Sequence, residues 1–264
     1  MLNLSGEVQS APFEALRQNL HPLTNESLTL RNNDNRFAFF DIQFSAPKDV
    51  SVLAMVVGDE RVRVAFHESV KVALAEMERF AAVRERRGFK SGSEEIRLTG
   101  NVVGATFLHD TSRDLDPQLH VHAVLANASW SAERKQWLAL KQNEMLRASP
   151  YIRQVLYREL ASRLRTLGYD PHEMNKNGFS VRGIEHLRER FSKRAQQIKV
   201  LSESFSIEKG RKPTSGEIAV LVRESRSEKL SEINTAAVRA KQRDEFSAVD
   251  ARSLDHLVDS ARRH

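Results

Sequence analysis

Apolar side chains recur at every second position in some segments of the chain and at every third or fourth in others, which predicts a mixture of strands and helices. The run FAFFDIQF, residues 37–44, alternates in the first way and predicts a strand that carries Asp41 on its more polar face. The next run, SAPKDVSVLAMVVG, predicts a helix that Ser45 caps, with Pro47 in its first turn and Gly58 at its end. A strand is therefore expected to lead directly into a helix N-terminus.

Longer periodic segments follow in the middle of the chain. They predict a charged amphipathic helix over residues 59–87 that ends at Gly88, strands over 96–109 and 118–130 joined by the polar loop DTSRDLDP, and a helix that Ser149 caps, Pro150 opens and Gly168 ends. The run KQWLAL predicts a further edge strand or hairpin arm. Strands and helices are thus expected to alternate irregularly rather than in repeated units.

The composition changes near Ile184, where charged helical segments begin. These segments are interrupted by the run KGRKP at residues 209–213, which contains both a glycine and a proline. The change predicts two domains, a core over residues 1–183 and a helical subdomain over 184–264.

Composition narrows the class of protein. The 264 residues are 40% hydrophobic, which is enough for a sizeable core, and the formal net charge of +6 favours a polyanionic partner such as nucleic acid. The absence of cysteine fits a reducing compartment and leaves only nitrogen and oxygen ligands for any metal. Since the sequence shows neither a membrane-spanning run nor a secretory signal, we expect a cytoplasmic protein without membrane insertion.

Three histidines, His109, His120 and His122, have a spacing that suits one metal ion. Side chains two apart on a strand share a face, so the HxH pair points one way and a third histidine need only lie on a neighbouring strand. Three neutral imidazoles with open coordination positions are typical of a catalytic rather than a structural metal site. Such ligands accept Mg²⁺, Mn²⁺, Zn²⁺ or Ni²⁺, so the sequence predicts a divalent ion without identifying it.

Asp41, Lys48 and Ser51 each allow two interpretations. Taken alone, Asp41 is a structural or solvated carboxylate; beside a metal it would orient a histidine ligand or accept a proton from an attacking hydroxyl. Lys48 and Ser51 are either ordinary surface groups or part of an anion site at the predicted helix N-terminus.

Three segments of the sequence resemble the MobF-class conjugative relaxases, members of the HUH endonuclease superfamily. They are FDIQFSAPKDVSV, TGNVVGATFLHDTSRDLDPQLHVHAV and RFSKRAQQI, and the central motif HxTSRxxDPQLHxHAV is long and specific. The resemblance spans most of the chain. It implies an α+β fold with a mostly antiparallel central sheet flanked by helices, followed by a C-terminal helical subdomain that embraces DNA.

The same resemblance implies an activity. Relaxases nick and rejoin single-stranded plasmid origin DNA by a metal-assisted attack of a tyrosine hydroxyl on the scissile phosphate. Carried over to this sequence, His109, His120 and His122 hold the metal, and Asp41 takes up the tyrosine proton and orients a histidine. Phosphate contacts fall on the basic residues Lys48, Arg113, Lys193 and Arg194. The implied partners are single-stranded or hairpin origin DNA, relaxosome accessory and coupling proteins, and a C-terminal helicase domain.

The sequence departs from the family at the nucleophile. Family members carry the reactive tyrosines, with a first strand of the sheet, upstream of the region that matches LSGEV, whereas the tyrosines here are Tyr151, Tyr157 and Tyr169. None of these lies in a family nucleophile motif. Two alternatives to an active relaxase therefore stay open: a catalytically silent module that binds metal and DNA, and an unrelated three-histidine zinc hydrolase.

Overall fold

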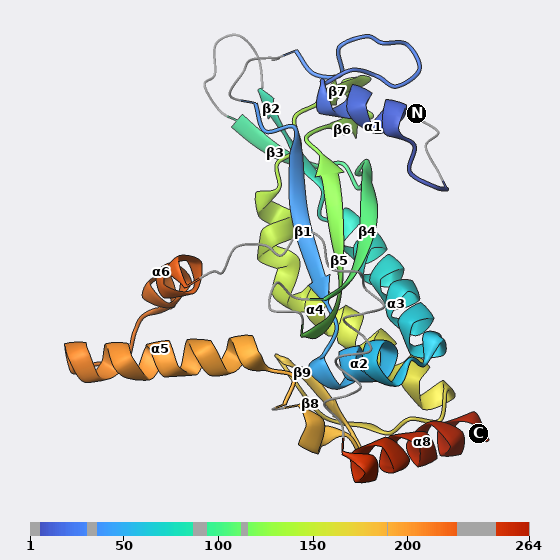
Figure 1. The fold of residues 1–264 in the computed structure, drawn as a ribbon. Coiled ribbons are helices and arrows are strands. Elements are labelled where there is room, and N and C mark those ends of the chain that lie inside the picture. Colours follow the sequence, from blue (N-terminus) through green and yellow to red (C-terminus); the bar gives the residue numbers. More distant parts are fainter. Residues whose placement is uncertain are drawn as a thin grey trace. The chain divides into compact units, whose positions relative to one another are not determined.

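The computed structural model describes residues 6–30, 36–86, 94–111, 116–188, 190–225 and 247–263 (Figure 1). The chain divides into two compact units. The first comprises Met1–Phe44, His67–Leu108 and His120–Leu160, and the second Ser45–Phe66, His109–Leu119 and Ala161–His264. The domain boundary predicted at residues 183/184 stays a prediction.

A three-stranded sheet has the order β1-β5-β4, so that β5 lies in the middle (Figure 1). Its strands are β1 (Phe39–Ser45), β4 (Gly104–Thr111) and β5 (Pro117–Ala126). The backbone N–H of Ala46 donates to the Leu119 carbonyl, and that of Asn127 to the Ala38 carbonyl. Because these bonds join opposite ends of the two strands, β1 and β5 are antiparallel. The predicted α+β class with a mostly antiparallel sheet is confirmed.

One face of β5 is apolar and fully buried, while the other carries polar and less completely buried side chains. Four apolar side chains on the buried face are at most 1% exposed: Leu119, Val121, Ala123 and Leu125. His120 and His122 alternate with them and therefore lie on the opposite face. Burying the apolar set fixes the strand's register, since a slip of one residue would exchange the two faces. Packing of the core thus decides which way the histidines point.

The helix after β1 starts later than predicted. Ser45 is the last residue of β1, and Pro47 is the N-cap of α2 (Lys48–Val52), with no side-chain hydrogen bond at the cap. Ser45 is therefore wrong as the cap, because the Ala46–Leu119 bond keeps the chain paired with β5 up to the residue before Pro47. A π-helical turn, η1 (Leu53–Val57), continues the helix to Gly58, which ends it at φ 82° as expected.

The predicted helix over residues 59–87 is wrong in its last third. α3 (Glu60–Glu78) ends early, and β2 (Ala82–Arg86) follows, paired antiparallel with β3 (Glu94–Leu98). Burial explains the change, because Ala82 and Val83 are fully buried and contribute to the core as part of a strand. Pairing with the next strand overrides the local helical pattern. Gly88 lies outside the described residues.

The strand predicted over residues 96–109 is two strands, because the chain turns between β3 and β4, where Gly100 has φ 62°. The strand predicted over 118–130 is likewise divided, since β5 ends at Ala126 and a short hairpin follows. That hairpin pairs β6 (Ser129–Ser131) with β7 (Gln136–Leu138) and confirms the hairpin arm predicted at KQWLAL.

The helix expected to open at Pro150 begins at Asn143 instead. α4 (Asn143–Thr166) contains Pro150 in its interior, and the Ser149 hydroxyl donates to the Met145 carbonyl within the helix rather than capping it. The fully buried side chain of Met145 explains the earlier start, because the extra turns carry another apolar residue into the core. Gly168 follows the helix with φ 88°, consistent with the predicted end.

The second unit contains a hairpin and most of the helical tail. Its elements after α4 are β8 (Pro171–Asn175), β9 (Gly178–Val181), η2 (Glu185–Leu187), α5 (Lys193–Lys209), α6 (Ser215–Glu224) and α8 (Ala248–Arg262). Gly210 ends α5 at φ 66°, within the predicted break at residues 209–213. A Cβ on Gly168 would lie 2.6 Å from the Ala261 carbonyl oxygen of α8, so only glycine permits this approach.

In the first unit, α1 (Ser10–Arg17) packs on the sheet through Phe13, whose ring stacks on Phe39 of β1 at 4.7 Å between centroids. Within the described ranges, no helix combines the length and the apolar character needed to cross a membrane.

Candidate metal centre

The two histidines of the HxH pair lie together on the polar face of β5. Their ring centroids are 5.2 Å apart, with an angle of 70° between the ring planes. His120 is 8% exposed, and the side chain of His122 is 29% exposed. The pair is thus partly shielded from water but not enclosed by the core.

Asp41 contacts His122 from the neighbouring strand β1. The Nδ1 atom of His122 is 2.8 Å from both carboxylate oxygens, and the Asp41 side chain is 56% exposed. In the neutral imidazole a carboxylate partner holds the proton on Nδ1, which leaves the lone pair of Nε2 free to bind a metal. The contact is the histidine-orienting arrangement that the sequence suggested for Asp41.

The donor chemistry fits a divalent cation in part. Two imidazoles on one strand, one of them oriented by a carboxylate, are the nitrogen ligands expected of a site without thiolates. His109 is exposed and lies on β4, the other neighbour of β5 in the sheet. In the part of the chain that the structure describes, no three His, Asp or Glu side chains are gathered closely enough to hold a metal. The three-histidine set therefore stays a prediction.

The basic residues predicted to contact phosphate fall in different settings. The ammonium of Lys48 donates to the Pro117 carbonyl oxygen at 2.9 Å, at the start of β5. Burial lowers the pKa of Lys48, and the nearby carboxylate of Asp116 partly opposes that shift. Arg113, and the side chains of Lys193 and Arg194 in the first turn of α5, lie outside the described residues.

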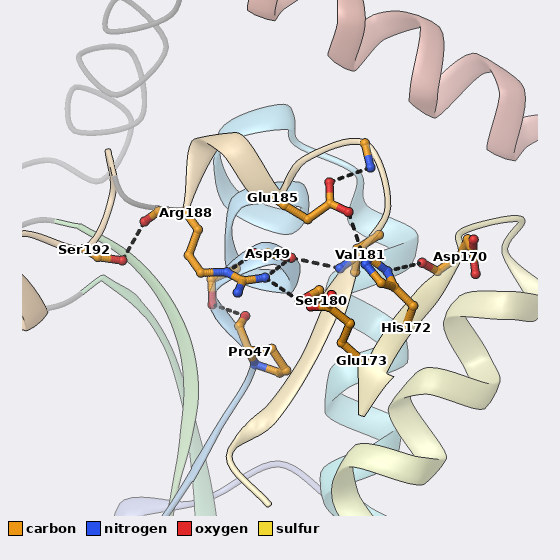
Figure 2. Close-up of polar contacts among 12 residues, drawn as sticks. Pro47, Asp49, Asp170, His172, Glu173, Ser180, Val181, Glu185, Arg188 and Ser192 are labelled. Atoms are coloured by element: carbon orange, nitrogen blue, oxygen red, sulfur yellow. Dashed lines mark hydrogen bonds and ion pairs between the residues drawn. The ribbon is translucent and has the colours of Figure 1, made fainter. Parts of the chain in front are cut away.

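Sequence reasoning missed an ion pair between a buried aspartate and a half-buried arginine in the second unit (Figure 2). Asp49 of α2 is 1% exposed and accepts three hydrogen bonds: from the Val181 backbone N–H at 2.8 Å, and from Arg188 Nε and Nη2 at 2.9 and 2.7 Å. Hydrogen bonding to Asp49 raises the pKa of Arg188. No local pattern identifies such a pair, because its members are 139 positions apart. The one hint in the sequence is that Asp49 directly precedes a mostly apolar run, residues 50–57.

The same network continues along the β8–β9 hairpin (Figure 2). Arg188 Nη2 also donates to the Ser180 hydroxyl at 2.7 Å, and that hydroxyl lies 3.2 Å from a carboxylate oxygen of Glu173. His172 Nε2 lies 3.2 Å from a carboxylate oxygen of Glu185. These contacts tie the hairpin to the segment that leads into α5.

The three tyrosines have partners or surroundings unsuited to a nucleophile. The Tyr151 hydroxyl donates to Glu76 at 3.0 Å, and the Tyr169 hydroxyl donates to Asp59 at 2.7 Å. Tyr157 is 7% exposed. The pKa of Tyr151 is raised chiefly by the Glu76 hydrogen bond, and burial raises the pKa of both Tyr157 and Tyr169. A raised pKa makes the phenolate harder to form, so none of the three is favoured as a nucleophile by a lowered pKa.

Comparisons with known proteins agree on one family. The family model described as TrwC relaxase matches residues 1–249. The multifunctional conjugation protein TraI of Escherichia coli (strain K12) is 35% identical over 209 residues, which is 75% of this chain and 12% of that protein. The chain thus spans about an eighth of the length of this relative.

Solved structures of the conjugative relaxase TrwC resemble this chain along nearly its whole length. A copper-bound complex with oriT DNA gives a TM-score of 0.80 and 32% identity, covering 96% of this chain and 84% of that one. A complex with a 27-mer DNA that comprises the recognition hairpin and the cleavage site also gives a TM-score of 0.80, at 31% identity, covering 96% and 88%. The similarity extends over both compact units.

Proposed function

Because the chain belongs to the TrwC relaxase family, we propose that it is a relaxase domain that nicks and rejoins one strand of plasmid origin DNA. The observation that carries this proposal is the Asp41–His122 pair beside His120 on the polar face of β5. TrwC has been solved with oriT DNA and in metal-bound form, which supports DNA and metal as ligands here too. A cytoplasmic location remains the expectation from the sequence.

We assign the metal ligands to His109, His120 and His122. A divalent ion bound there would act as a Lewis acid on the scissile phosphate and neutralise charge in the transition state. His122 is prepared for this role because Asp41 fixes its tautomer, and His120 because β5 presents it on the same face. The identity of the metal among Mg²⁺, Mn²⁺, Zn²⁺ and Ni²⁺ is open.

Asp41 has a second proposed role as proton acceptor. When a tyrosine oxygen attacks phosphorus, the phenol proton must leave and the 3′ oxygen of the departing strand must become a hydroxyl. Asp41 has an exposed carboxylate beside the histidine pair, so it is able to accept that proton. Both roles require Asp41 to be ionised and to face the substrate.

DNA binding rests on charge and on the helical tail. The net charge of +6 favours phosphate contacts, for which Lys48, Arg113, Lys193 and Arg194 are the candidates, and residues 184–264 are proposed to embrace the strand. A helicase domain in the full-length protein and relaxosome accessory and coupling proteins are further proposed partners.

A second candidate function is a module that binds metal and DNA without cutting. It is favoured by the three tyrosines, whose hydroxyls are bonded to carboxylates or buried. If none of them attacks, the nucleophile has to come from a tyrosine outside this set. The two candidates share every binding residue and differ only in the chemical step.

One assay separates them. The chain is incubated with Mn²⁺ and a labelled oligonucleotide that carries the origin hairpin and cleavage site, and products are resolved on a denaturing gel. A labelled protein adduct that disappears in the His120→Ala, His122→Ala double variant supports the relaxase. Specific binding without an adduct supports the silent module, and absence of binding at low salt contradicts both.

A further inference from the structure

We propose that Lys48 and Ser51 are positioning residues that set the direction of the His120 side chain by fixing the backbone at the start of β5. This inference rests on the proposed function only in treating His120 as a metal ligand. It gives Lys48 a role distinct from a phosphate contact, and it gives a role to the buried hydroxyl of Ser51.

Ser51 holds the peptide nitrogen of Leu119. The Leu119 N–H donates to the Ser51 hydroxyl oxygen at 3.1 Å, while that hydroxyl donates to the Pro47 carbonyl at 3.2 Å. Both Ser51 and Leu119 are at most 1% exposed, so water cannot replace either bond. The hydroxyl is therefore the polar partner that allows this N–H to be buried.

The carbonyl of Leu119 is held from the same segment. The Ala46 N–H donates to it at 2.9 Å, so both polar backbone atoms of Leu119 are bound by residues 46–51. The Leu119 carbonyl and the His120 N–H belong to one planar peptide group. Fixing that plane fixes the N–Cα bond of His120, so only the φ angle, which pairing of β5 in the sheet restricts, remains to set the direction of its Cα–Cβ bond.

Lys48 holds the residue that opens β5. Its ammonium donates to the Pro117 carbonyl at 2.9 Å, and the carboxylate of Asp116, which is 2% exposed, lies close enough to affect its pKa. Proline has no N–H and cannot join the strand ladder through its nitrogen, so the carbonyl is its available backbone anchor. Lys48 thus secures the chain three residues before His120.

Such anchoring matters because metal sites tolerate little displacement. Ligand distances in a working site stay within about 0.2 Å of their ideal values, and loss of groups that orient ligands weakens metal binding about 10- to 100-fold. A loosened β5 start would misplace His120 while the rest of the sheet stays folded.

The test compares Ser51→Ala and Lys48→Met with two matched controls. Ser69→Ala removes another fully buried serine hydroxyl, and Lys71→Met removes another lysine charge. Co²⁺ affinity is measured by absorption titration, and affinity for the hairpin oligonucleotide is measured as a function of salt. We expect each test variant to bind Co²⁺ about 10-fold more weakly than its control. Ser51→Ala, at a residue with no proposed DNA contact, should keep the DNA affinity and the salt dependence of Ser69→Ala.

Amide hydrogen exchange at Leu119 and the Lys48→Met comparison test the positioning role independently. In Ser51→Ala, amide hydrogen exchange at Leu119 should speed up while Ser69→Ala leaves it unchanged; if Ser51→Ala does not fold, the Lys48→Met comparison decides. Unchanged Co²⁺ affinity in the folded test variants overturns the inference. So does a loss of DNA affinity in Ser51→Ala beyond that in Ser69→Ala, because a hydroxyl that only positions a metal ligand makes no phosphate contact.

Failure of the proposed function gives a different pattern. A wild-type chain that binds Co²⁺ and DNA but forms no adduct would remove the cleavage proposal, while weaker Co²⁺ binding by the test variants would still support the positioning role. A wild-type chain that binds no Co²⁺ would contradict both.

Discussion

Asp41 on β1 and Asp49 on α2 lie on consecutive elements of the chain and have opposite surroundings. Asp41 is 56% exposed and contacts one imidazole nitrogen. Asp49 is fully buried and accepts three hydrogen bonds, two of them from Arg188. The same side chain therefore serves two purposes. Asp41 retains accessible oxygen atoms for chemistry, whereas those of Asp49 are occupied in holding α2 to the segment around β9.

Burial and the number of donors, rather than residue type, separate a reactive carboxylate from a structural one. A buried carboxylate is tolerated only when it is paired and hydrogen-bonded, and losing its partners lowers the stability of the fold. An exposed carboxylate contributes little to stability, so its loss mainly affects the reaction. Substitutions at Asp41 should therefore change activity, whereas substitutions at Asp49 or its partner should change stability.

The largest expected effect is on the reaction at Asp41. Asp41→Ala should lower the rate of strand cleavage about 10²- to 10⁴-fold, because a proton acceptor and the orienting partner of His122 are lost together. Affinity for the origin oligonucleotide should stay within about twofold, and Gln43→Ala on the same face of β1 provides the matched control. Equal losses of cleavage and binding would mean that Asp41 maintains the fold instead.

The opposite pattern is expected at the pair of Asp49 and Arg188. Arg188→Met leaves the buried Asp49 carboxylate with one backbone donor and should lower the free energy of unfolding by about 1–3 kcal/mol, less than for a fully buried pair because the Arg188 side chain is 41% exposed. Urea unfolding measures this loss, and Arg182→Met, which breaks an exposed pair with Asp170, is the control, for which a much smaller loss is expected. A loss at Arg188 no larger than at Arg182 would remove the distinction between the two kinds of site.

Asp59, a second buried carboxylate of the second unit, and its partner Tyr169 predict how stability depends on pH. Burial raises the pKa of Asp59, but hydrogen bonds from Arg61 and Tyr169 outweigh it and lower the pKa overall; burial and Asp59 raise the pKa of Tyr169. Because the pKa of Tyr169 is raised in the folded protein, this residue contributes stability that is present below the ordinary tyrosine value of about 10 and is lost at higher pH. Tyr169→Phe should therefore cost about 1–2 kcal/mol near pH 7, and this difference should shrink above about pH 10. A difference that grows with alkaline pH would contradict the assignment.

The lowered pKa of Asp59 affects stability at acidic pH. Its contribution is present above the ordinary aspartate value of 3.8 and is lost as the pH falls toward the lower folded value. Acid unfolding of Tyr169→Phe should accordingly begin at a higher pH than that of the wild type, as followed by circular dichroism.

The smallest expected effect is at Tyr151. Tyr151→Phe removes only the exposed hydrogen bond to Glu76 and should change the cleavage rate less than about twofold, because an exposed bond of this kind contributes little. A cleavage assay that showed loss of the covalent adduct in this variant would make Tyr151 the nucleophile and reverse the interpretation of α4.

Local patterns in the sequence were sufficient to predict the strand of Asp41, the HxH pair and the helical tail. Each depends on a period of two or on spacings within one element. The structure places Asp41 beside His122, whereas the role of Asp41 in the reaction stays a prediction. The contacts of Lys48 with Pro117, of Asp49 with Arg188 and of Asp59 with Tyr169 could not be predicted, because each joins residues far apart in the chain. The helix wrongly extended over β2 has another cause: pairing with β3 decided the structure there, and the helical pattern of a single segment does not show such pairing.

Metal affinity of the folded protein tests the contrast between the two aspartates most directly. Co²⁺ binding is measured for the wild type, Asp41→Ala and Asp49→Asn at a temperature at which all three are folded. We expect about 10- to 100-fold weaker binding for Asp41→Ala and wild-type affinity for Asp49→Asn. Equal affinities in all three proteins, or a greater loss in Asp49→Asn, would contradict this expectation.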